Sequence, residues 1–162
     1  MRRIAIILLA LIIVAGAFLL LKYREYSRES RIIDDLLQSH IDANVPPDNV
    51  FDRFLQQDLT KYFKPTMGSD FAVQYDFLRR GPTQVGIGYP KFYLSVQITR
   101  GRQLLKEGYV RVAAVDRREF LITDFIPQAS VLADSTVLDS VFPVLVRAEI
   151  MARIRRSRDH AA

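Results

Sequence analysis

The sequence predicts an α+β fold preceded by an apolar N-terminal helix, and three features support this class. An uncharged apolar run occupies Ile4–Leu21. Residues 30–62 and the C-terminal stretch from Pro143 have apolar residues at helical spacing,. Between them, apolar and polar residues alternate over residues 71–126, as in strands that are buried on one face,. We therefore expect helices packed on a curved antiparallel sheet of about four strands, followed by a C-terminal helix.

The stretch Lys91–Ile126 forms the centre of the predicted sheet. Its first part, KFYLSVQITR, alternates strictly, and the following Arg100-Gly101-Arg102 supplies a turn,. GYVRVAAV repeats the alternation, and REFLITDFI resumes it until Pro127, which lacks the N–H that a strand ladder needs,. The short connections indicate an antiparallel meander.

The apolar run Ile4–Leu21 is 18 residues long, close to the roughly 20 residues with which a helix crosses a bilayer. A cleaved signal peptide is the alternative, because Ala15-Gly16-Ala17 resembles a processing site,. Cleavage there would leave FLLL at the new terminus, so we favour an uncleaved anchor. We expect residues 1–29 to be the anchor and a polar stalk, and residues 30–162 to be the α+β domain.

The helix after the anchor carries an apolar stripe that comprises Ile32, Ile33, Leu36, Leu37 and Ile41. We expect this stripe to pack on the sheet as part of the domain core. A coiled-coil seam is the alternative, but the stripe covers too few heptads to favour it.

Basic residues flank the predicted span on both sides, with Arg2 and Arg3 before it and Lys22 and Arg24 after it. We expect these four side chains to lie near lipid headgroups. Their near balance leaves the orientation open. A short N-terminal tail usually stays in the cytoplasm in bacterial single-span proteins, so we expect a single-pass protein of the bacterial inner membrane with its soluble domain in the periplasm or otherwise outside the cytoplasm.

The formal charge of +5 resides at the two chain ends, since residues 22–146 hold 16 Lys and Arg against 16 Asp and Glu. A neutral body argues against a nucleic-acid binder. The chain has no cysteine, and its histidines are His40 and His160. We therefore predict no metal site, no cofactor and no Ser/His/Asp triad.

Arg155 and Arg156 belong to a basic C-terminal stretch. Pairing with the negative end of a helix dipole explains them without a ligand. Contact with anionic lipid headgroups is the alternative, because the chain carries a predicted membrane anchor.

Two helices followed by the meander FYLSVQITRGRQLLKEGYVRVAAVDRREFLITDFI resemble the cystatin-like and nuclear-transport-factor-two-like class of α+β domains. The resemblance is architectural and covers about residues 30–127. Single-span proteins that carry such a domain outside the membrane include the bitopic assembly factors of type IV secretion machines. The resemblance therefore implies docking to partners instead of chemistry.

Two sets of side chains are candidate functional residues. Tyr93, Tyr109 and Arg111 occupy the alternate strand positions that carry mainly polar residues, which we call the polar parity of the sheet. Tyrosines on such a face suit partner binding. The alternatives are an ordinary solvated face or one that the terminal helix covers. Asp124 shares its parity with Phe120 and Ile122, which makes it a candidate buried acid in a pocket, although a bond to an arginine is commoner.

We predict a non-enzymatic, membrane-anchored interaction or assembly module of the bacterial cell envelope, such as a part of a secretion or envelope complex. Its expected partners are the lipid bilayer and other envelope proteins, and the sequence leaves homo-oligomers open. The alternative is a small-molecule-binding or enzymatic domain that uses a pocket between helices and sheet with Asp124 as the acid.

Overall fold

The structure of the protein is a computed structural model that describes residues 2–84 and 88–159. For residues 2–14, 25, 28, 29 and 32 the description covers the backbone alone. The chain divides into two compact units, Met1–Ser39 and His40–Ala162. Our domain boundary after residue 29 rests on where the polar stalk ends in the sequence, and it stays a prediction.

Helix α1 spans Arg2–Asn44, which confirms that the apolar run and the polar stretch after it form one helix. Of the apolar stripe that we expected in the core, Ile33 and Leu36 are 57% and 63% exposed, whereas Leu37 and Ile41 are half-buried. Packing of this stripe on the sheet stays a prediction. Among the described residues, no helix has a stretch long and apolar enough to cross a membrane. The predicted span Ile4–Leu21 includes residues whose side chains lie outside this description.

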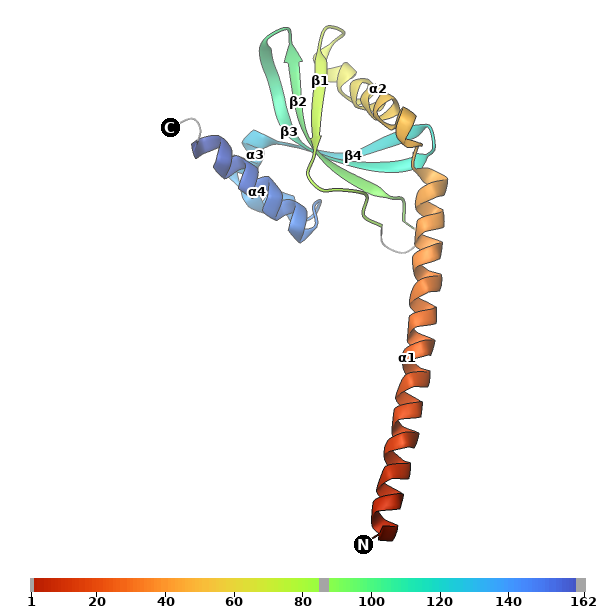
Figure 1. The fold of residues 1–162 in the computed structure, drawn as a ribbon. Coiled ribbons are helices and arrows are strands. Elements are labelled where there is room, and N and C mark those ends of the chain that lie inside the picture. The colour runs from red at the N-terminus through yellow and green to blue at the C-terminus, as the bar shows by residue number, and fades with distance from the viewer. Residues whose placement is uncertain (1, 85–87, 160–162) are drawn as a thin grey trace. The chain divides into compact units, whose positions relative to one another are not determined.

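Four antiparallel strands form one sheet in the order β1-β2-β3-β4, as the alternation predicts. The strands are β1 Ala72–Phe77, β2 Lys91–Arg100, β3 Gln103–Asp116 and β4 Glu119–Pro127. Helix α2, Asp48–Met67, packs on one face of the sheet, and the C-terminal helices lie on the other (Figure 1). These are α3 Gln128–Ala133, the short 3-10 helix η1 Ser135–Leu138 and α4 Val144–Asp159. The predicted α+β class and the C-terminal helix are therefore confirmed.

The α2 face of the sheet holds the larger apolar core. Helical spacing brings Leu55, Leu59 and Phe63 to one side of α2, where they are almost fully buried,. They meet the apolar parity of the central strands, including Phe92 and Val112. Because the strand alternation puts every second residue on this face, the polar parity is left for the opposite one.

The α4 face holds a second core. Val146, Ile150 and Ile154 recur along one side of α4 and are buried. Together with Val131 and Leu138 from the preceding turns, they cover residues that stand on the mainly polar parity of the strands. The sheet is thus covered on both faces, and this arrangement positions the site described below.

Helix α2 is hydrogen-bonded to both edge strands. Gln56 Nε2 donates to the Val73 carbonyl oxygen of β1 at 2.8 Å, and the Phe120 N–H of β4 donates to Asp58 Oδ2 at 2.7 Å. The outer strands of a flat four-strand sheet lie about 14 Å apart, more than the helix diameter of about 10 Å. The α2 helix can reach both edges because the sheet curves around it.

Asp58→Ala is expected to lower the free energy of unfolding by about 1–3 kcal/mol, because the Phe120 N–H loses its acceptor. The measurement is urea unfolding of the full-length chain in detergent micelles, followed by circular dichroism. Gln57→Ala, an exposed neighbour on α2, is the matched control and is expected to stay within about 0.5 kcal/mol of the parent. Equal stability of the two variants would show that Asp58 does not hold the β4 edge.

Candidate binding pocket

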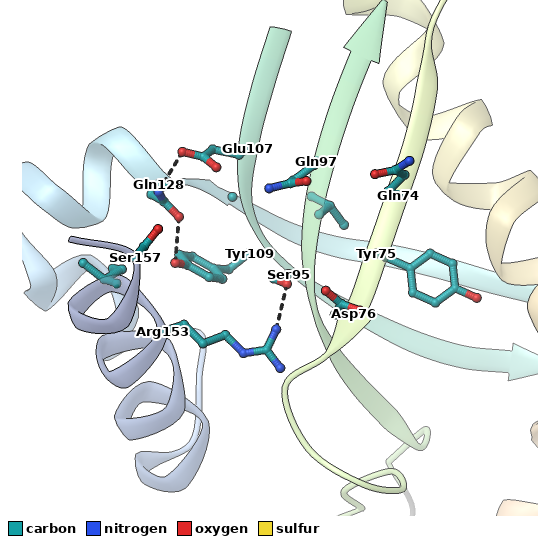
Figure 2. Close-up of a pocket in the computed structure, with 13 residues that line it drawn as sticks. Gln74, Tyr75, Asp76, Ser95, Gln97, Glu107, Tyr109, Gln128, Arg153 and Ser157 are labelled. Atoms are coloured by element: carbon teal, nitrogen blue, oxygen red, sulfur yellow. Dashed lines mark hydrogen bonds between the residues drawn. The ribbon is translucent and has the colours of Figure 1, made fainter. Parts of the chain in front are cut away.

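A pocket of about 320 Å³ lies on the α4 face of the sheet. Strands β1, β2 and β3 form its floor, and the start of α3 and the last turns of α4 form its walls (Figure 2). Its lining is mostly polar and comprises Gln74, Tyr75, Asp76, Ser95, Val96, Gln97, Glu107, Gly108, Tyr109, Gln128, Arg153, Ile154 and Ser157.

Two rows of side chains cross the strands at the floor of the pocket. In the first row, Gln74 of β1 pairs with Gln97 of β2, which pairs with Glu107 of β3. Residues paired directly across a sheet point to the same face. The first row therefore presents two amides and a carboxylate side by side.

The second row lies one two-residue step further along the strands. Asp76 pairs with Ser95, which pairs with Tyr109. By contrast, the intervening Tyr75 points away from the pocket in Figure 2, and its hydroxyl donates to Asp52 on α2 at 2.8 Å. The alternation of β1 thus assigns Asp76 to the pocket and Tyr75 to the α2 face.

Tyr109, Gln128 and Glu107 form a hydrogen-bonded chain at one wall. The Tyr109 hydroxyl donates to Gln128 Oε1 at 2.9 Å, and Gln128 Nε2 donates to Glu107 Oε1 at 2.7 Å. Burial, and secondarily the Glu107 carboxylate, raise the pKa of Tyr109 to about 12. The phenol therefore stays neutral at physiological pH and acts as a donor, which fixes the orientation of the Gln128 amide.

Arg153 connects α4 to two strands. Its Nη1 donates to Ser95 Oγ at 3.1 Å, and its Nη2 donates to the Phe77 carbonyl oxygen at 2.8 Å. Its Nε donates to Glu149 Oε1 at 2.9 Å, one helical turn earlier. This last bond, chiefly, lowers the pKa of Glu149 below its usual 4.5. The bond between Arg153 and the ionised Glu149 carboxylate therefore stabilises the folded state above pH 4.5. This contribution is lost as the pH falls through the lower pKa that Glu149 has in the folded state.

Tyr93 and Tyr109 do not form an exposed partner-binding face. They are only 3% and 2% exposed, because the C-terminal helices cover them. Tyr93 packs against Phe142, and its hydroxyl is hydrogen-bonded to Thr83 Oγ1 at 2.8 Å. The prediction of an exposed tyrosine face is wrong, and the alternative of a face covered by the terminal helix is confirmed.

Asp124 does not share a face with Phe120 and Ile122. In the β3–β4 register Arg111 pairs with Asp124, and the next residue of β3 pairs with Ile122, so Thr123 is an extra residue in β4. Such a β-bulge shifts the side-chain alternation by one position. The prediction of a shared face is therefore wrong, because it assumed an unbroken alternation along the strand.

Asp124 instead forms an ion pair with Arg111, whose Nη2 lies 2.6 Å from Asp124 Oδ2. Arg111 Nη1 also donates to the Val141 carbonyl oxygen at 3.1 Å. The commoner outcome for such an aspartate, a bond to an arginine, is confirmed. Neither residue lines the pocket described above.

The basic residues expected near lipid differ in their surroundings. Lys22, Arg24 and Arg155 are exposed. Arg156 lies 3.0 Å from the Glu149 carboxylate, an intramolecular ion pair. The side chains of Arg2 and Arg3, the other two, lie outside the described residues. Contact of all six with lipid stays a prediction.

Within the described residues, no three His, Cys, Asp or Glu side chains gather as a metal site would require.

Of the pocket residues, sequence reasoning singled out Tyr109, but it missed the other members of the two polar rows and Arg153. The rows were detectable in principle, because Gln74 and Gln97 stand on the polar parity of alternating strands,. Arg153 carries no comparable signal, because its role depends on where α4 docks on the sheet.

Comparison with known proteins gives no match: no family model, no curated protein and no solved structure matches the chain. The architectural resemblance to cystatin-like and nuclear-transport-factor-two-like domains therefore stays a prediction.

Arg153→Ala is expected to lower the free energy of unfolding by about 1–3 kcal/mol, because the Phe77 carbonyl and Ser95 hydroxyl lose a charged donor. Chemical unfolding of the full-length chain in detergent measures this change. Arg155→Ala, an exposed arginine on the same helix, is the control and is expected to be near neutral. If both variants unfold at the same urea concentration, Arg153 does not anchor α4.

Proposed function

We propose that this protein is a single-pass, membrane-anchored interaction module of the bacterial cell envelope, and that the pocket on the α4 face is its contact site. The pocket is the observation that carries the interaction role. It is formed by polar side chains on adjacent strands of one sheet, and sheets hold such groups in fixed geometry.

The membrane anchor is supported by the sequence. An 18-residue uncharged run forms a helix about 27 Å long, close to the roughly 30 Å of the hydrocarbon core. Lys22 and Arg24 follow it directly, where basic side chains suit the headgroup region. On the same grounds as in the sequence analysis, we place the folded domain outside the cytoplasm.

Recognition fits the pocket better than proton-transfer chemistry. Tyr109 is a neutral donor to Gln128, and the Glu107 carboxylate accepts from the same amide. The Arg153 guanidinium is committed to Ser95 and to the backbone of β1. Asp124, the acid of the alternative mechanism, is paired with Arg111 away from the pocket. These bonds favour a preorganised binding surface over a general acid or base.

Replacing Ile12 and Ile13 together by arginine is expected to release the chain from membranes, because two arginines at the centre of a span cost about 5 kcal/mol or more. Alkaline extraction of cell membranes followed by immunoblotting measures the release. The Ile12→Leu, Ile13→Leu double variant is the control and is expected to remain in the membrane.

A parent chain that alkaline extraction releases would contradict the anchor. A topology reporter fused after Ala162 tests the side of the membrane, and we expect the activity of an extracytoplasmic reporter.

A photoreactive amino acid placed at Ser157, on the rim of the pocket, is expected to crosslink the full-length chain to a discrete partner in cells that naturally contain it. The same group at the exposed Gln57 on the α2 face is the control and is expected to give no such product. Gln97→Ala is expected to reduce the Ser157 product, because it removes a pocket amide. Equal products from both positions, or none from Ser157, would contradict a contact site at the pocket.

A further inference from the structure

Several polar groups of the pocket have no hydrogen-bond partner within the part of the chain that the structure describes. They are the amides of Gln74 and Gln97, the Asp76 carboxylate and the Ser157 hydroxyl. The other polar side chains of the lining are hydrogen-bonded within the protein, either to one another, as in the Tyr109–Gln128–Glu107 chain, or to groups outside the lining, as Tyr75 is to Asp52. The groups without partners are available to a ligand.

The charges in and beside the pocket oppose an anionic ligand. Asp76 and Glu107 both line it, and each would repel a phosphate or carboxylate,. Arg153, the cation in the lining, has its guanidinium committed to Ser95, Phe77 and Glu149. An anion would therefore meet two carboxylates and a cation that is already engaged.

A cationic ammonium group would be attracted by Asp76 and Glu107, but it only donates hydrogen bonds and would leave the N–H groups of the Gln74 and Gln97 amides without an acceptor. A purely apolar ligand is disfavoured as well. It would displace the water molecules to which the free amides are hydrogen-bonded and would offer these amides no hydrogen bond in return. The ligand that fits is neutral and carries many donors and acceptors.

An extended peptide strand is disfavoured by the edge of β1. The Leu78 N–H donates to the Tyr93 carbonyl oxygen at 2.9 Å, which fixes the phase of the β1–β2 ladder. In an antiparallel pair the backbone N–H and C=O groups of every second residue point away from the partner strand. In β1 the residues whose backbone groups point to the free edge include Val73 and Phe77.

The outward carbonyls of these two residues are already bonded, Val73 to Gln56 and Phe77 to Arg153. A peptide strand that paired with this edge would have to compete with the Gln56 and Arg153 side chains for these two carbonyl oxygens.

We propose that the pocket binds a neutral saccharide, held by the side chains of Gln74, Gln97 and Asp76. This rests on the proposed function and specifies the ligand of the same site. Each sugar hydroxyl both donates and accepts, and a planar amide offers one donor edge and one acceptor edge. Two amides and a carboxylate on neighbouring strands can therefore bond to adjacent hydroxyl groups of one sugar ring.

The test uses the full-length chain in phosphatidylcholine nanodiscs, which avoids sugar-based detergents. Maltotriose and the N-acetylglucosamine trimer are the neutral saccharide probes. The galacturonic acid trimer, the glucosamine trimer and N-acetyl-triglycine amide are the anionic, cationic and peptide comparisons. Binding is followed by calorimetry and by the side-chain amide NMR signals of Gln74 and Gln97, which the single variants assign.

At least one neutral saccharide is expected to bind saturably and roughly tenfold more tightly than each comparison probe. Gln74→Ala and Gln97→Ala are each expected to weaken that binding roughly tenfold, with the melting temperature unchanged. Gln103→Ala, the same change at an exposed glutamine of the sheet outside the pocket, is the matched control and is expected to bind like the parent.

The saccharide proposal is overturned if neither neutral saccharide binds, if a charged or peptide probe binds as tightly, or if the Gln74 and Gln97 variants bind like the parent. In each case the Ser157 crosslink still reports separately whether the pocket is a contact site. Failure of the saccharide with a retained crosslink therefore overturns the ligand class alone.

Discussion

The architecture of the folded unit depends on the way α2 holds the two edges of the sheet. The Asp58 carboxylate accepts from the backbone of β4, and the Gln56 amide donates to the backbone of β1. Both bonds come from one helix whose buried side chains fill the space between the edges. These contacts hold the sheet in the curved form that lets α2 reach both edges, and the apolar side chains of the strands are buried on that side,.

The position of α2 also explains why the pocket lies on the α4 face of the sheet. Because α2 takes the apolar parity, the α4 face is built from the mainly polar one, which α4 covers only in part. Near Tyr93 the cover is complete, whereas beside Gln74 and Gln97 it leaves the pocket open. Arg153 stands at the boundary between these regions, where it joins α4 to β1 and β2.

Much of the fold could be predicted from periodicity, because a strand buried on one face must alternate and these four do. The failures have local causes. The bulge at Thr123 reversed the face of Asp124, and no residue in REFLITDFI marks it. The covering of Tyr93 depended on the docking of α4, which is set by packing with residues distant in sequence. The pocket depended on the same docking, so only its strand side chains carried a sequence signal.

Hydrogen exchange at the Phe120 amide tests the central claim most directly, because this N–H belongs to an edge strand and points to Asp58 instead of another strand. If α2 holds the β4 edge, the Phe120 amide should exchange as slowly as amides of the central strand β3, such as Val112. Exchange at the rate of an exposed edge amide would show that α2 does not hold this edge of the sheet and would contradict the account.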